Sequence, residues 1–96
     1  MTGPADGYGL TLFVSGASGL AARAVVDTRR LLDQHLATAS RLTVVDIHED
    51  PAAGSRSGIL VTPTLVRNTP LPARKVAGDL SDVPRVLAAL GLVDAG

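Results

Sequence analysis

The sequence of 96 residues has no cysteine and no tryptophan, and its only aromatic residues are Tyr8 and Phe13. The missing cysteines exclude a disulfide framework, a thiolate nucleophile, a cysteine-ligated zinc site and a dithiol redox centre. Because aromatic rings are so scarce, a core must be built from leucine, valine, isoleucine and alanine, whose small volumes leave little margin in so short a chain.

An excess of charge and a long apolar run are also missing. Lys+Arg 9 balance Asp+Glu 9, so the formal net charge is zero and there is no electrostatic footprint for nucleic acid or an anionic membrane surface. The apolar runs are far shorter than the ~20 residues that span a bilayer, and segment 1–7 lacks the apolar stretch of a signal peptide. We therefore expect a cytoplasmic protein with neither nucleic acid nor membrane as a partner.

Residues that could bind a metal or a phosphate lack the necessary spacing. His35 and His48 lie thirteen positions apart and belong to no recognised metal-ligand pattern. Gly16 and Gly19 lie between a strand and a helix, where backbone N–H groups attract anions, but the full glycine-rich spacing of a nucleotide-binding loop is absent. We expect no metal, no cofactor and no catalytic residue.

What is present indicates a single α/β domain over 8–93, preceded by a loose tail over 1–7. Hydrophobic residues make up 46% and charged residues 19% of the chain, as in folded globular domains. The run 8–14 and the run 42–47 predict strands, and an amphipathic helix capped by Ser18 lies between them, so the three elements predict a parallel βαβ unit. The apolar stripe of that helix has a period of 3.6 and comprises Leu20, Ala21, Ala24, Val25, Leu31, Leu32 and Leu36.

A hairpin follows in the second half of the chain. Segment 50–58 is a weak helix or a loop. Pro63 would remove a hydrogen-bond donor from the middle of a strand, so we place the next strand just after it, over 64–67. The turn 68–72 then leads to a strand over 73–77, and two strands so close in sequence pair antiparallel.

The last segment predicts a helix. Ser81 is a good N-cap, Asp82 is favourable in the first turn, Pro84 is tolerated there, and Gly91 ends the helix. The complete order is βαβαββα, which indicates a four-stranded mixed sheet flanked by helices.

Several stretches of this sequence carry a resemblance to a known family. LFVSG (12–16), VVDIHEDP (44–51), ILVTPTLVR (59–67) and PLPARKVAGDLSD (70–82) together resemble the KaiB family of circadian clock proteins, and the similarity runs without a gap from about residue 10 to residue 92. The resemblance implies a thioredoxin-like fold. In that fold the proline that matches Pro63 usually follows a cis peptide bond.

The resemblance implies a non-enzymatic regulatory protein that binds a KaiC-type hexameric ATPase, in clock-like timing or in stress-response signalling. KaiB proteins are also known for a second fold of the same chain, in which the C-terminal half is rearranged and the chains associate into dimers or tetramers. Pro63, Pro70 and Pro72 lie in that half. Pro84 fits the first turn of a helix but would delete a ladder bond from a strand, so we expect this chain to favour the thioredoxin-like state.

Two groups of residues are candidates for partner binding. Basic residues occur at matching positions of KaiB proteins and are linked to partner binding there, although a merely solvated face is the alternative. The strand over 42–47 would be a sheet edge, which could pair with another chain. The candidates are Arg23, Arg67, Arg74 and Lys75 among the basic residues, and Leu42 and Val44 on the edge strand.

Two other functions stay open at this point. The chain could be a sensor or docking domain related to the input module of a clock-linked histidine kinase. It could also be a thiol-free relative of glutathione- or peptide-binding proteins, in which the backbone at Thr62 and Pro63 pairs with a peptide-like ligand.

Overall fold

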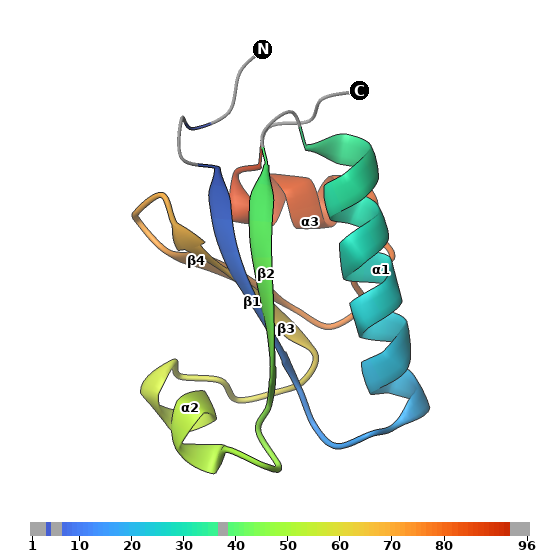
Figure 1. The fold of residues 1–96 in the computed structure, drawn as a ribbon, viewed down its shortest axis with the longest axis vertical. Helices are drawn as coiled ribbons and strands as arrows, with labels where there is room; N and C mark the ends of the chain where they lie inside the picture. The colour runs from blue at the N-terminus through green and yellow to red at the C-terminus, as the bar shows by residue number, and fades with distance from the viewer. Residues whose placement is uncertain (1–3, 5–6, 37–38, 93–96) are drawn as a thin grey trace.

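The computed structural model describes residue 4 and the ranges 7–36 and 39–92, so most of the predicted tail over 1–7, and residue 93, lie outside the described residues. The elements follow in the predicted βαβαββα order (Figure 1). Their bounds are β1 Tyr8–Val14, α1 Gly19–His35, β2 Ser40–Asp46, α2 Pro51–Arg56, β3 Thr64–Thr69, β4 Arg74–Ala77 and α3 Val83–Leu90.

The four strands form one mixed sheet in the order β2-β1-β3-β4. β1 lies in the interior, parallel to β2 and antiparallel to β3, and β3 pairs antiparallel with β4. The predicted parallel βαβ unit and the predicted hairpin are therefore both confirmed. β2 and β4 are the two edges of the sheet, so β2 leaves one row of backbone hydrogen-bonding groups without a neighbouring strand.

The predicted bounds of β2 and β3 were wrong, because tertiary pairing decides them. β2 begins at Ser40 rather than Leu42, since it pairs with β1 from its first residue, Tyr8 opposite Ser40. β3 continues to Thr69, which pairs with Gly9 across a register shift in β1. The uncertain segment 50–58 contains the short helix α2, and the carboxylate of Asp50 caps it by accepting from the N–H of Ala53 at 3.2 Å.

The N-cap of α3 was also assigned to the wrong residue. Asp82 caps this helix, with its carboxylate accepting from the N–H of Arg85 at 3.3 Å, whereas Ser81 bonds to Asp79. Pro84 lies in the first turn, where a backbone N–H would have no acceptor within the helix, so its absence costs no hydrogen bond. Gly91 ends the helix in the left-handed conformation with φ 60, as the sequence predicts.

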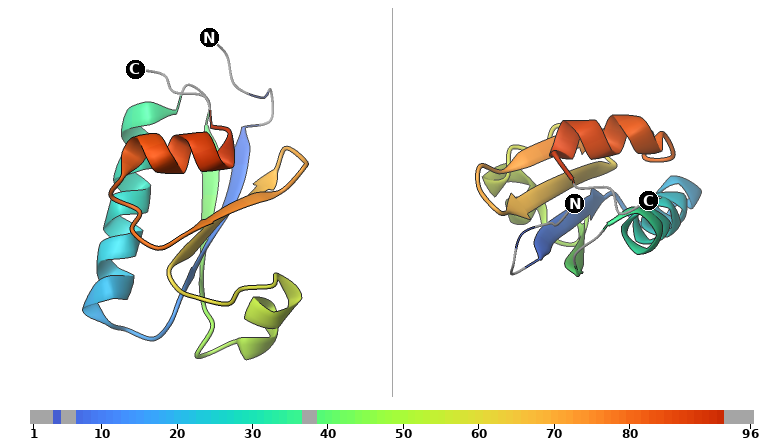
Figure 2. Two further views of the ribbon diagram at one scale, coloured as in Figure 1. Left: turned by 180° about the vertical axis from the view of Figure 1, so that it is seen from behind. Right: turned by 90° about the horizontal axis from the view of Figure 1, so that it is seen from above.

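The core lies on the sheet face that α1 and α3 cover, as the views in Figure 2 show. Alternate residues of β1 point into it, as the period of two in a strand requires. Helices α1 and α3 complete this face with residues spaced three and four apart. The buried members are Tyr8, Leu10, Leu12, Val14, Ala21, Ala24, Leu31, Leu65, Val76, Leu80, Val86, Leu90 and Leu92.

One member of the predicted apolar stripe does not join this core. Leu20, in the first turn of α1, is 72% exposed. Within the described part of the chain, no helix has both the length and the apolar character that a bilayer crossing requires.

We expect Leu65→Ala to lower the free energy of unfolding by about 2–5 kcal/mol, because this side chain is fully buried in the core and its loss leaves a cavity. Leu71→Ala is the matched control, since Leu71 is 79% exposed, and its effect should stay within about 0.5 kcal/mol. Urea denaturation measures both values. Equal effects of the two substitutions would contradict the assigned core.

Candidate interaction surface

The loop between β1 and α1 is held by a carboxylate. In redox thioredoxins this loop carries the cysteine pair, and here it has none. The N–H of Gly16, which has φ 70, donates to Asp46 Oδ1 at 2.8 Å, and the N–H of His48 donates to the same oxygen at 2.9 Å. These bonds, that from Gly16 first, lower the pKa of Asp46 from its ordinary value. Asp46 thus joins this loop to the end of β2.

The segment before β3 turns at a cis peptide bond between Thr62 and Pro63, as the resemblance implies. The carbonyl of Pro63 accepts from the N–H of Gly78 at 3.0 Å, which joins this turn to the end of β4. The bonds before Pro70 and Pro72 are also cis. The loop after β1, the Thr62–Pro63 turn and the segment after β4 thus lie at one end of the sheet.

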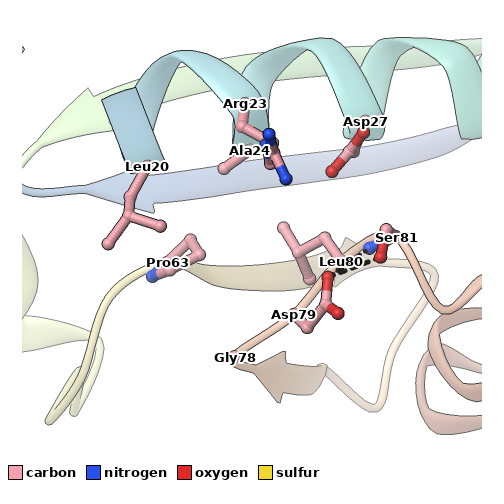
Figure 3. Close-up of a pocket in the computed structure, with 9 residues that line it drawn as sticks. All are labelled: Leu20, Arg23, Ala24, Asp27, Pro63, Gly78, Asp79, Leu80 and Ser81. Carbon is pink, nitrogen blue, oxygen red and sulfur yellow. Dashed lines mark hydrogen bonds between the residues drawn. The ribbon is translucent and has the colours of Figure 1, made fainter. Parts of the chain in front are cut away.

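A cleft of about 410 Å³ lies at this end, between the first turns of α1 and the segment that joins β4 to α3 (Figure 3). In Figure 3, Leu20 extends from α1 toward Pro63, and Asp27 extends from α1 toward Ser81. The cleft is mostly apolar, with one basic and two acidic side chains along its walls. Its lining consists of Leu20, Arg23, Ala24, Asp27, Pro63, Gly78, Asp79, Leu80 and Ser81.

Hydrogen bonds hold the wall of the cleft that Asp79 contributes. Its carboxylate accepts from the hydroxyl of Ser81 at 2.7 Å and from the N–H of Ser81 at 2.9 Å. These bonds, with smaller contributions from Arg85 and Arg23, lower the pKa of Asp79. The guanidinium of Arg85 donates to the carbonyl of Ala77 at 3.2 Å and to the carbonyl of Asp79, so α3 holds the same segment from the other side.

Arg67 and Arg74, two of the predicted partner-binding residues, lie directly opposite each other on β3 and β4. Arg74 is exposed, but Arg67 is only 7% exposed. Arg67 Nη1 donates to the carbonyl of Gly91 at 3.3 Å, and Nη2 donates to the carbonyl of Pro72 at 2.6 Å. Arg67, a candidate for partner binding, therefore has its side chain under the end of α3 and not on an open face of the hairpin.

The other predicted residues lie elsewhere on the sheet. Lys75 points away from Arg74, as predicted, and its Nζ donates to the carbonyls of Ser57 and Gly58 at 3.4 and 3.3 Å. Leu42 packs against the core, and Val44 is 40% exposed, both on the edge strand β2. Because β2 and β4 are opposite edges, the six candidates do not form one patch, and Arg23 alone lines the cleft.

Sequence reasoning did not single out the exposed apolar residues around the Thr62–Pro63 turn. Leu60 is 95% exposed and Val61 is 56% exposed, directly before the Thr62–Pro63 turn, and Leu20 lies beside the same turn. The signal was the apolar run 59–61, which ends two residues before Pro63, a residue that is excluded from a regular strand interior. We call Leu20, Leu60 and Val61 the apolar rim.

A model of the KaiB domain matches residues 11–92 of this chain. The chain belongs to the KaiB family. It is 38% identical over 86 residues to the circadian clock oscillator protein KaiB of Nostoc punctiforme, covering 90% of this chain and 83% of that protein. It is 36% identical over 90 residues to the KaiB of Synechococcus elongatus, covering 94% of this chain and 88% of that protein.

Solved structures support the fold independently. The solution structure of the N-terminal domain of Synechococcus elongatus SasA superimposes with a TM-score of 0.75, covering 91% of this chain and 86% of that domain at 23% identity. This similarity confirms the thioredoxin-like fold. KaiB proteins are clock regulators and not enzymes, so membership of the family confirms the predicted class of function.

The hydrogen bonds from Gly16 and His48 to the Asp46 carboxylate predict that the stability of the protein depends on pH. The folded-state pKa of Asp46 lies below its ordinary value of 3.8, so its stabilising contribution is present at neutral pH and is lost as the pH falls through the folded-state pKa. We expect Asp46→Asn to lower the urea midpoint at pH 7 and to match the unsubstituted chain well below pH 3.8.

Asp33→Asn is the control for this measurement, because Asp33 is an exposed carboxylate on α1. A loss of stability in Asp46→Asn that is the same at every pH would show that the carboxylate charge does not hold the loop.

Proposed function

We propose that this protein is a non-enzymatic regulator that binds a KaiC-type hexameric ATPase through its thioredoxin-like form, in clock-like timing or in stress-response signalling. The observation that carries the proposal is the uninterrupted KaiB match over 11–92, on a chain that folds as a thioredoxin-like domain and has no cysteine. Since no thiol chemistry is available, what remains at the loop end of the sheet is a shaped surface.

The apolar rim supports a docking site at this end of the molecule. Exposed large side chains that gather at one place mark interaction surfaces, and the loop that carries Leu60 and Val61 lines a second depression of about 340 Å³ beside β4. Arg23 adds a charged group at the cleft. We therefore assign the contact with the ATPase to the apolar rim together with Arg23.

The edge strand β2 provides a second surface. Its unpaired backbone groups could accept a strand from another chain, and Leu42 and Val44 would flank that contact. We propose that association of this protein with itself, as a dimer or a tetramer, or with a further regulatory protein uses this edge. We also propose that the protein acts in the cytoplasm. Because its charges balance, we propose neither nucleic acid nor an anionic membrane surface as a partner.

The docking site is tested with two exposed leucines at opposite ends of the molecule. We expect Leu60→Asp to weaken binding to the KaiC-type ATPase of the same genome by about tenfold or more, because it places a charge in an apolar contact. Leu71→Asp, in the turn between β3 and β4, should change the affinity by less than about twofold. Pull-down, with ATP hydrolysis assayed with and without this protein, measures both.

Binding that survives Leu60→Asp but not Leu71→Asp would move the interface to the other end of the sheet. If neither this protein nor its variants bind the ATPase or change its rate of hydrolysis, the proposed function is wrong.

The cleft beside Pro63 is the observation that favours the glutathione- or peptide-binding alternative. The proposed function predicts that glutathione causes no saturable shift in the amide signals of Gly16, Gly78 and Asp79, which surround this cleft and its neighbouring loop. A saturable shift at these signals would favour the alternative, and chemical-shift titration measures it.

A further inference from the structure

Two guanidinium groups meet at the C-terminal end of α3. Arg67 and Arg74 are direct partners in the register of β3 and β4, so their side chains leave the same face of the hairpin. An ideal Cβ placed on Gly91 would lie 3.2 Å from Arg67 Nη1 and 3.7 Å from Arg74 Nη1, so these two nitrogen atoms are at most about 7 Å apart. Two positive charges therefore share the small space above Gly91.

No carboxylate neutralises this pair among the residues that the structure describes. Arg67 and Arg74 form no ion pair there, and the two partners of Arg67 are the uncharged carbonyls of Gly91 and Pro72. Arg67 is only 7% exposed, and its Nε is buried without a hydrogen-bond partner. A guanidinium that is removed from water normally has an acidic or phosphate partner.

The pair also has hydrogen-bond donors to spare. Each guanidinium carries five N–H donors in a planar fork, and Arg67 uses its two terminal nitrogens for one bond each. The carbonyls at the C-terminal end of α3 supply only a partial negative charge. An oxyanion with two or more oxygen atoms could accept from both arginines and turn their mutual repulsion into attraction.

We propose that Arg67 and Arg74 form a binding site for one oxyanion, a carboxylate or a phosphate, at the C-terminal end of α3. Arg67 is held in place by its two carbonyl contacts and provides the fixed half of the site. The exposed Arg74 provides the half that closes on the ligand. The site stands on this geometry, at the opposite end of the hairpin from the residues assigned to the ATPase contact.

The site is tested by titrating the full chain with inorganic phosphate and, separately, with N-acetylglutamate, at constant ionic strength set by chloride. We expect saturable shifts in the amide signals of Gly91 and Leu92 and in the Nε–H signal of Arg67. Arg74→Gln should weaken the binding at least tenfold. The control is Arg29→Gln, which removes an exposed arginine from α1 and should leave the affinity unchanged.

The outcomes show whether an oxyanion binds at all and whether a carboxylate or a phosphate binds more tightly. Tighter binding of N-acetylglutamate indicates a protein carboxylate as the natural ligand, and tighter binding of phosphate indicates a phosphorylated one. An Asp94→Asn chain is titrated in parallel, and shifts seen only with this variant would support the site and identify the chain's own acidic residue as its occupant. No saturable shift in either chain, or equal losses in Arg74→Gln and Arg29→Gln, would overturn the proposal.

Anion binding and ATPase binding are measured separately, so each proposal can fail without the other. If phosphate binds and the ATPase does not, the oxyanion site stands and the proposed function falls. If the ATPase binds and neither anion shifts the spectrum, the proposed function stands and the oxyanion site falls.

Discussion

The pairing of β1 on both of its sides is the constraint from which the other features follow. One strand must be parallel to β2 and antiparallel to β3 while its alternate side chains fill the core under α1 and α3. That arrangement leaves β2 as an open edge and brings the end of β1, the start of α1 and the Thr62–Pro63 turn to one end of the sheet. The cleft lies where the start of α1 and Pro63 meet the segment that joins β4 to α3.

Backbone hydrogen bonds to carboxylates give this end of the molecule its shape. Asp46 accepts from Gly16 and His48, and Asp79 accepts from Ser81, so each carboxylate holds a turn whose N–H groups lack a strand or helix partner. Bonds of this kind favour the charged carboxylate, which is why the pKa of both aspartates is lowered. In a thioredoxin-like domain without cysteine, they maintain a defined surface where related folds maintain a reactive thiol.

The opposite end of the hairpin is organised by arginine. Arg67 lies under the last turn of α3, where it donates to two carbonyls, and Arg74 lies beside it. The absence of a side chain at Gly91, which also ends α3, leaves room for both guanidinium groups. A single glycine thus serves the local requirement for a helix end and the tertiary requirement for a close approach.

The sequence by itself determined the element order, because β1 is an apolar run, α1 has a period of 3.6, and Pro84 and Gly91 suit the two ends of a helix. Its similarity to KaiB proteins determined the family. Tertiary structure alone decided the burial of Arg67 and the exposure of Leu20 and Leu60. These depend on which segments from distant parts of the chain lie against each residue, and neither residue type nor local spacing contains that information.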